Sequence, residues 1–119
     1  MKFKHSVRIK QYTPALAWML YQIEKCEHMH QSFPEIVITS INDSSHMEGS
    51  RHYTGEAVDI RTHNFPDMIA KNTFVNTLLY MLNNNFEASV RDRFSILHES
   101  VGTPNEHIHV QVKRGQKYP

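Results

Sequence analysis

Apolar residues recur at helical spacing in the first third of the chain. The dipeptide Thr13-Pro14 is a helix start signal, because the hydroxyl can cap the helix and proline suits the first turn. The apolar residues that follow at positions i, i+3, i+4 and i+7 are Leu16, Met19, Leu20 and Ile23. This spacing predicts a helix from Pro14 to about His30 that buries one stripe.

A second helical pattern occupies the middle of the chain. The run Asn64-Phe65-Pro66 opens it, and three asparagines at positions 83–85 stop it. Its apolar stripe is formed by Val75, Leu78, Leu79 and Leu82.

Several shorter segments have the patterns of strands. Residues 2–10 alternate between polar and apolar side chains, which is typical of a half-buried strand. The run Ile36–Ile41 is β-branched almost throughout and predicts an interior strand buried on both sides. Further strands are expected at Ala57–Ile60, Phe94–Leu97 and His107–Lys113. Two helices beside several short strands indicate an α+β fold, with a small antiparallel-rich sheet packed against two main helices.

Length and composition set the limits of this interpretation. A chain of 119 residues with 39% hydrophobic residues fits a single globular domain over residues 1–119. The net charge of +1 argues against nucleic acid as the main partner. The one cysteine, Cys26, excludes an intramolecular disulfide, and its place in the first helical pattern predicts burial. No apolar run has the length of a signal peptide or a membrane span, so we expect a chain made in the cytoplasm, without membrane insertion. We also expect a monomer.

Two segments far apart in the sequence carry the candidate chemistry. Residues 50–59 contain His52 and, seven positions later, Asp59; residues 106–109 read Glu-His-Ile-His. Two imidazoles and a carboxylate suit a catalytic zinc ion that keeps its fourth position for water. On a helix, His52 and Asp59 would stand about 10 Å apart, too far to share an ion. We therefore expect a loop that turns at Gly55 and continues into a strand.

Strand alternation then decides which side chains face the metal. Asp59 would point away from its core-facing neighbours Val58 and Ile60. His107 and His109 would both look the same way, and only one of them need be the ligand. His98, on a neighbouring expected strand, is a further histidine that could approach the site.

The two segments resemble the motifs of a zinc peptidase family. This family comprises D-alanyl-D-alanine carboxypeptidases, D,D-dipeptidases and L-alanyl-D-glutamate endopeptidases, which cut bacterial peptidoglycan stem peptides. Its first motif, Ser-x-His-x-x-Gly-x-Ala-x-Asp, is filled here by Ser50, His52, Gly55, Ala57 and Asp59. Its later Glu-x-x-His is filled by Glu106 and His109, and the His-Ile-His run is also similar to the Hedgehog signalling domain.

The resemblance implies a role for each matched residue. Zinc would be held by His52, Asp59 and His109, and Glu106 would be the general base. His109 is preferred to His107 as the third ligand because Glu106 then stands at the family's spacing of three. Glu99 and Glu56 are rival carboxylates, since Glu106 on an ideal strand would face away from His109. Three further residues would act in the outer shell or line the cleft: Ser50, His107 and Tyr53.

One departure concerns substrate binding. Many members of the family carry an arginine in a Ser-Gly-Tyr-Arg-like run after the strand that precedes the first motif, whereas residues 39–43 here contain none. Arg61 or Arg51 could instead contact a terminal carboxylate of the substrate.

The resemblance implies a fold like that of the Hedgehog and D,D-peptidase domains, and a function in cell-wall degradation. A small chain without a wall-binding module fits a phage-type lytic enzyme that reaches the bacterial wall after release or by virion delivery. The alternative is a non-catalytic zinc-containing module of a virion or larger assembly. The sequence leaves open which peptide bond would be cut, whether D-Ala-D-Ala, L-Ala-D-Glu or another.

Overall fold

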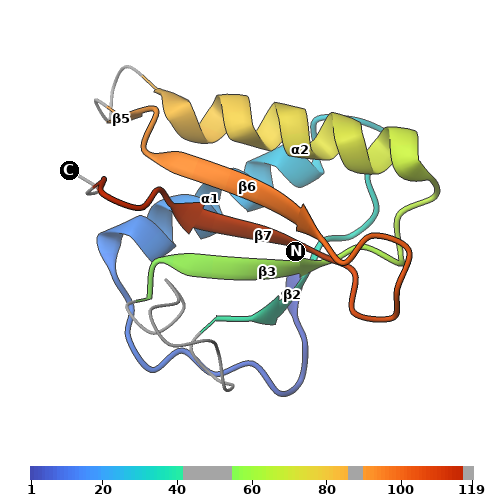
Figure 1. Ribbon diagram of the computed structural model, residues 1–119, viewed down its shortest axis with the longest axis horizontal. Coiled ribbons are helices and arrows are strands. Elements are labelled where there is room, and N and C mark those ends of the chain that lie inside the picture. Colours follow the sequence, from blue (N-terminus) through green and yellow to red (C-terminus); the bar gives the residue numbers. More distant parts are fainter. Residues whose placement is uncertain (42–54, 86–89, 117–119) are drawn as a thin grey trace.

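The fold is built on one five-stranded mixed sheet and two helices (Figure 1). The computed structural model describes residues 1–41, 55–85 and 90–116. The sheet has the strand order β1-β2-β3-β7-β6, and its strands are β1 (Lys2–Phe3), β2 (Val37–Ser40), β3 (Ala57–Arg61), β7 (His107–Val112) and β6 (Phe94–Glu99). Only the β1–β2 pair is parallel. The expected α+β class and the antiparallel-rich sheet are confirmed.

Both helices begin where a side chain can cap them. Helix α1 (Pro14–Glu27) starts after Thr13, whose Oγ1 accepts a hydrogen bond from the Leu16 amide at 3.0 Å. Helix α2 (Met68–Asn83) starts after Asp67, whose carboxylate accepts from the Ala70 amide at 2.8 Å. The first start agrees with the sequence. The second lies just after the expected Asn64-Phe65-Pro66 opening, at Asp67, whose carboxylate caps the first turn.

The cap of α1 also ties the helix to the start of β3. Thr13 Oγ1 donates a hydrogen bond to the Gly55 carbonyl at 2.8 Å. We expect Thr13→Ala to lower the free energy of unfolding by about 1–2 kcal/mol, because the variant loses the cap and this tertiary bond together. Urea unfolding monitored by circular dichroism measures the loss, and Thr13→Ser, which keeps the hydroxyl, should recover most of it. A Thr13→Ala variant as stable as the parent would contradict the role of this hydroxyl.

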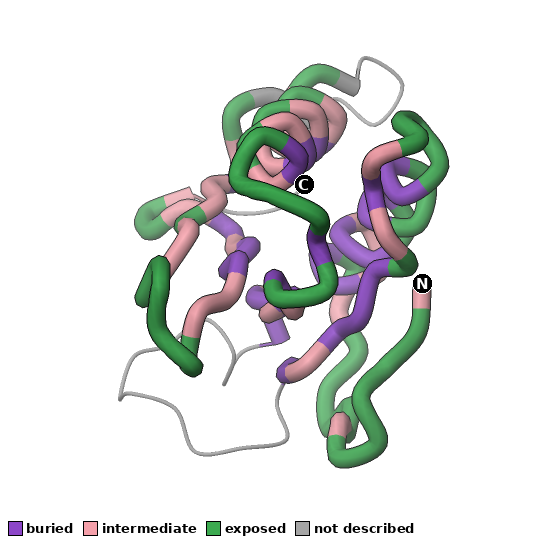
Figure 2. Tube along the Cα trace, turned by 90° about the vertical axis from the view of Figure 1, so that its right-hand side faces the viewer, coloured by how far each residue is buried: buried purple, intermediate pink, exposed green. Residues whose placement is uncertain are grey.

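The core fills the space between the helices and one face of the sheet (Figure 2). Alternation along the strands separates the two faces, so that Val58 and Ile60 of β3 are fully buried while Asp59 between them is half-buried. On β7 the buried apolar residues are Ile108, Val110 and Val112. The stripe of α1 is buried as expected, and so is Cys26, whose pKa is raised to about 12 by burial. The opposite face of β3 and β7 therefore remains available for polar side chains.

Three expectations from the patterning need correction. The strand expected over residues 2–10 ends at Phe3, because β2 offers β1 only Val37 and Ile38 as partners and the chain turns at Lys4–Val7. Helix α1 ends at Glu27, before His30. On α2 the stripe is rotated: Ala70, Phe74, Leu78 and Leu82 are buried, whereas Val75 and Leu79 are half-buried.

The remaining elements are short. Strands β4 (Asn84–Asn85) and β5 (Val90–Arg91) pair as a small separate ladder after α2 and were not expected from the sequence. Neither helix in the described part of the chain is long and apolar enough to cross a membrane.

Candidate metal centre

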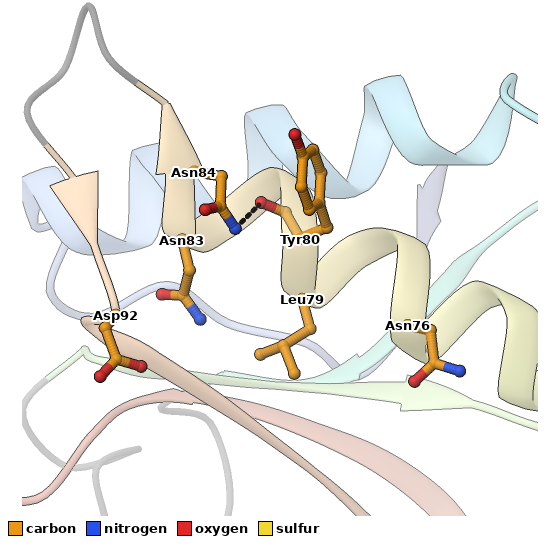
Figure 3. A pocket seen from close by; sticks show the side chains of 6 residues that line it. All are labelled: Asn76, Leu79, Tyr80, Asn83, Asn84 and Asp92. Atoms are coloured by element: carbon orange, nitrogen blue, oxygen red, sulfur yellow. Dashed lines mark hydrogen bonds between the residues drawn. The ribbon is translucent and has the colours of Figure 1, made fainter.

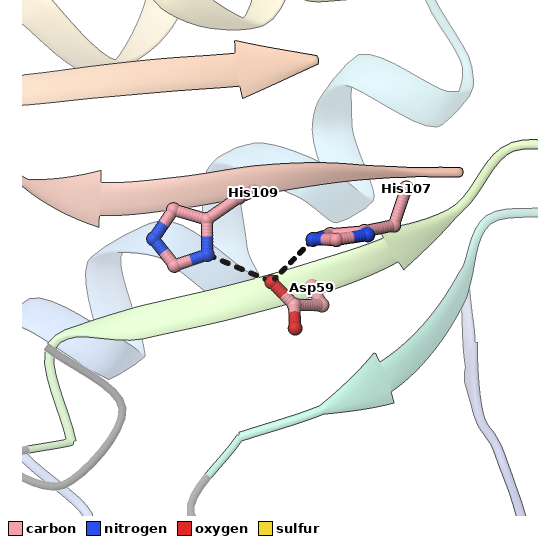
Figure 4. Close-up of side chains that lie close together, drawn as sticks. All are labelled: Asp59, His107 and His109. Atoms are coloured by element: carbon pink, nitrogen blue, oxygen red, sulfur yellow. Dashed lines mark hydrogen bonds and ion pairs between the residues drawn. The ribbon is translucent and has the colours of Figure 1, made fainter. Parts of the chain in front are cut away.

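Asp59 and His109 face each other across two neighbouring strands. They are paired Cα partners in the antiparallel ladder of β3 and β7. Asp59 Oδ1 lies 2.8 Å from His109 Nδ1. Asp59 and His109 are 50 residues apart in the sequence, so the sheet is what brings the two side chains together. Both point to the face of the sheet that the helices do not cover (Figure 4).

His107 joins this pair from the same strand as His109. Alternation along β7 places both imidazoles on one face, as expected. His107 Nε2 lies 3.9 Å from Asp59 Oδ1, and one ligand atom from each of the three residues lies within 4.8 Å of the others. Asp59, His107 and His109 are therefore close enough to bind one metal ion.

The outer contacts of His107 fix which of its nitrogens can bind a cation. Its Nδ1 lies 2.7 Å from the Asn105 carbonyl oxygen, which can only accept, so Nδ1 carries the proton. In the neutral ring, Nε2 is then the lone-pair nitrogen, and it is the one that faces Asp59. Metal-binding histidines characteristically donate their other N–H to a carbonyl or carboxylate in this way.

His109 has the same arrangement with its nitrogens exchanged. Its Nε2 lies 2.8 Å from Gln111 Oε1, which leaves Nδ1 towards Asp59. Burial opposes a charge on this ring, yet the hydrogen bonds with Asp59 and Gln111 and the nearby carboxylates together raise the pKa of His109. A cation has to compete with a proton for the place between His109 and Asp59.

The donor set fits a first-row transition ion better than calcium or magnesium. Two imidazole nitrogens and one carboxylate oxygen are ligands typical of zinc, whereas calcium and magnesium favour oxygen alone. The side chains of Asp59 and His109 are 15% and 11% exposed, so an ion between them would be partly shielded from water. The third residue, His107, is 29% exposed and lies on the solvent side.

Glu106 is held on the other side of the sheet. It precedes His107, so alternation places it with Ile108 on the helix-facing side. Its Oε2 lies 2.8 Å from Lys71 Nζ of α2 and 2.5 Å from His98 Nε2 of β6. Its Oε1 accepts a hydrogen bond from the Gly102 amide at 3.3 Å.

These contacts stabilise the ionised carboxylate of Glu106. The hydrogen bond from Lys71 is the largest cause that lowers its pKa to about 2; burial opposes it, and His98 and Gly102 assist. A carboxylate with so low a pKa is a weak proton acceptor near neutral pH. The structure thus brings His107 to Asp59 and His109 but does not bring Glu106 or His98 to them.

The other residues named from the sequence fall into two groups. Arg61 follows Asp59 on β3, lies on the same face by alternation, and is the Cα partner of His107. The positions of Ser50, Arg51, His52 and Tyr53 lie outside the described residues. The expectation that His52 completes the zinc site therefore stays a prediction.

Three residues support the triplet: Asn105 and Gln111, which the sequence did not single out, and Glu99, which was named from it only as a rival of Glu106. The Asn105 carbonyl and the Gln111 side chain orient the two imidazoles, and Glu99 of β6 lies 3.2 Å from His107 Nε2. Gln111 could have been found from the sequence, because it follows His107 and His109 at the same strand spacing. Glu99 required the pairing of β6 with β7, which places it opposite His107.

A separate hollow of about 490 Å³ lies along the second half of α2 (Figure 3). Its walls are formed by Asn76, Leu79, Tyr80, Asn83, Asn84 and Asp92, none of which belongs to the metal triplet. The amide of Asn83 is already bonded to both backbone groups of Phe94, and that of Asn84 to the Tyr80 carbonyl. Asn83 thus holds the end of α2 against β6, and Asn84 caps the last turn of α2, which are structural roles.

No family model, curated protein or solved structure matches this chain. The geometry of the triplet is therefore what bears on function, together with the motif resemblance.

Proposed function

We propose that the chain is a zinc-dependent peptidase that hydrolyses peptidoglycan stem peptides or cross-links. One observation carries the proposal: Asp59 and His109, which the motif resemblance assigns to zinc, oppose each other on β3 and β7 with 2.8 Å between Oδ1 and Nδ1. The resemblance extends the proposal to a fold of the Hedgehog and D,D-peptidase type and to a phage-type lytic enzyme that acts at the bacterial wall.

The described residues supply the binding part of such a site. Asp59 and His109 hold the ion, and Asn105 and Gln111 fix the tautomers of the imidazoles. A zinc ion bound there would supply Lewis-acid activation of a water molecule and of the scissile carbonyl. Arg61, which alternation puts on the same face, would contact a substrate carboxylate.

The resemblance assigns proton transfer to Glu106, whose carboxylate is bound by Lys71 and His98 on the helix side. To act as the base, Glu106 would have to leave Lys71 and turn towards the opposite face. This placement favours the second candidate function, a zinc-containing binding or structural module without hydrolytic activity.

Digestion of purified peptidoglycan tests the proposal. We expect zinc-loaded protein to release new stem-peptide fragments, identified by mass spectrometry, and the masses name the bond that is cut. The Asp59→Asn variant is the control, because it lacks the anionic ligand but keeps the size of the side chain. Absence of fragments from protein shown to contain zinc would favour the non-catalytic module.

The Glu106→Gln variant separates the two roles of that residue in the same assay. Lost turnover with zinc retained would support Glu106 as the base and require it to leave Lys71. Undiminished turnover would remove Glu106 from the mechanism.

A further inference from the structure

Glu99 reaches the metal triplet from a third strand. It ends β6 and is the Cα partner of His107 on β7, so its side chain lies on the face that carries His107 and His109. Its Oε1 lies 3.2 Å from His107 Nε2 and 3.9 Å from His109 Nδ1. These are the two nitrogens that also face Asp59.

The contacts of His107 show which of its two nitrogens faces the carboxylates. Because Nδ1 donates to the Asn105 carbonyl, Nε2 of the neutral ring presents a lone pair to Glu99 at 3.2 Å and to Asp59 at 3.9 Å. A lone pair and two carboxylates repel one another unless a proton or a metal cation lies among them. The same holds for His109 Nδ1, which lies between the same two carboxylates while Nε2 is bonded to Gln111. A metal ion that replaced the protons would be surrounded by two imidazole nitrogens and two carboxylates.

We propose that Glu99 is a fourth protein donor of the metal centre, so that β3, β7 and β6 together hold a divalent transition-metal ion with two imidazoles and two carboxylates. The inference deepens the proposed function and rests on its metal centre. Glu99 is 44% exposed, the most of the four side chains, so it is the donor on the solvent side. It is also the donor that an incoming water molecule or substrate group would most readily replace.

Metal titration of matched variants tests the role of Glu99. The full chain, stripped with a chelator, is titrated calorimetrically with Zn²⁺, and the Co²⁺ form is followed by its visible spectrum, which reports coordination. We expect Glu99→Gln to weaken Zn²⁺ binding by more than about 100-fold and to change the Co²⁺ spectrum, because loss of an outer-shell partner alone costs about 10- to 100-fold. Asp92→Asn is the control, because it removes one carboxylate charge from an 81% exposed side chain paired with Lys113, away from the triplet, and should leave both readouts unchanged.

Salt separates ligation from simple attraction between charges. If Glu99 only attracted the ion through its charge, the difference in Zn²⁺ affinity between the parent and Glu99→Gln would shrink at 1 M salt, where the Debye length is about 3 Å. A difference in affinity that persists at 1 M salt supports a direct bond between Glu99 and the ion. A difference that disappears overturns the proposal that Glu99 is a ligand.

The outcomes distinguish this inference from the proposed peptidase activity. Zn²⁺ binding by Glu99→Gln as tight as that of the parent, with the same Co²⁺ spectrum, overturns the role of Glu99 and leaves the peptidase standing. Weakened binding by the variant, with no hydrolysis by the parent, supports Glu99 and removes the peptidase. No binding of either ion by the parent chain overturns both.

Discussion

The Asp59→Asn variant is expected to lose metal binding and, with it, all activity that depends on the ion. Asp59 Oδ1 is 2.8 Å from His109 Nδ1 and 3.9 Å from His107 Nε2, so it is the atom that the two imidazoles share. An amide oxygen in its place carries no charge and cannot balance a divalent cation. Because loss of an outer-shell partner alone costs about 10- to 100-fold in affinity, loss of this ligand should cost more than about 100-fold.

Calorimetry and metal analysis of the purified variant measure this effect. The control is Asp92→Asn, which makes the same chemical change at an 81% exposed side chain paired with Lys113, away from the triplet. If Asp59→Asn bound zinc with the affinity of the parent, the zinc site would lie elsewhere in the chain. Unchanged far-ultraviolet circular dichroism would establish that the loss is local.

The local part of the fold was readable from the sequence. The start of α1 depends on Thr13 and Pro14, and its buried stripe on a period of 3.6 residues, both of which are properties of short segments. The same is true of β3, where apolar neighbours on both sides of Asp59 predict which way the carboxylate points. That prediction is confirmed by the burial of Val58 and Ile60.

The predictions that failed concern segments whose structure depends on residues far away in the sequence. The alternation of residues 2–10 is typical of a strand, but an edge strand extends only as far as its neighbour pairs with it, and β2 pairs with two residues. On α2, contact with α1 and the sheet decides which face is buried. That face contains Phe74 and not the expected Val75. No local pattern contains this information.

In the candidate site, too, local patterns were predictable and contacts between distant segments were not. His107 and His109 share a face because of strand alternation, which the sequence displays. The position of Glu99 depends on the register between β6 and β7, which the sequence does not display. Glu106 is the instructive case, because its motif spacing favours the metal face while strand alternation places it on the helix side, beside Lys71.

Stability at acidic pH is expected to depend on Glu106. Its pKa is lowered to about 2, so it contributes stability that is present above its ordinary pKa of 4.5 and is lost as the pH falls from there towards 2. With the side chains of Glu106 and Lys71 only 12% and 14% exposed, the contribution should reach about 1–3 kcal/mol at neutral pH. Glu106→Gln should lose this amount and show a flatter dependence of stability on pH.

Urea unfolding at a series of pH values between 7 and 2 provides the test. The exposed Lys113–Asp92 pair offers a matched comparison, because removing it with Asp92→Asn should cost at most about 0.5 kcal/mol. Lys71→Met should lose stability and move the acid transition to higher pH, since the main cause of the lowered pKa is removed. If Glu106→Gln unfolds like the parent at every pH, the Lys71–Glu106–His98 contacts contribute nothing to stability. Glu106 would then be free to leave Lys71, as the role of general base requires.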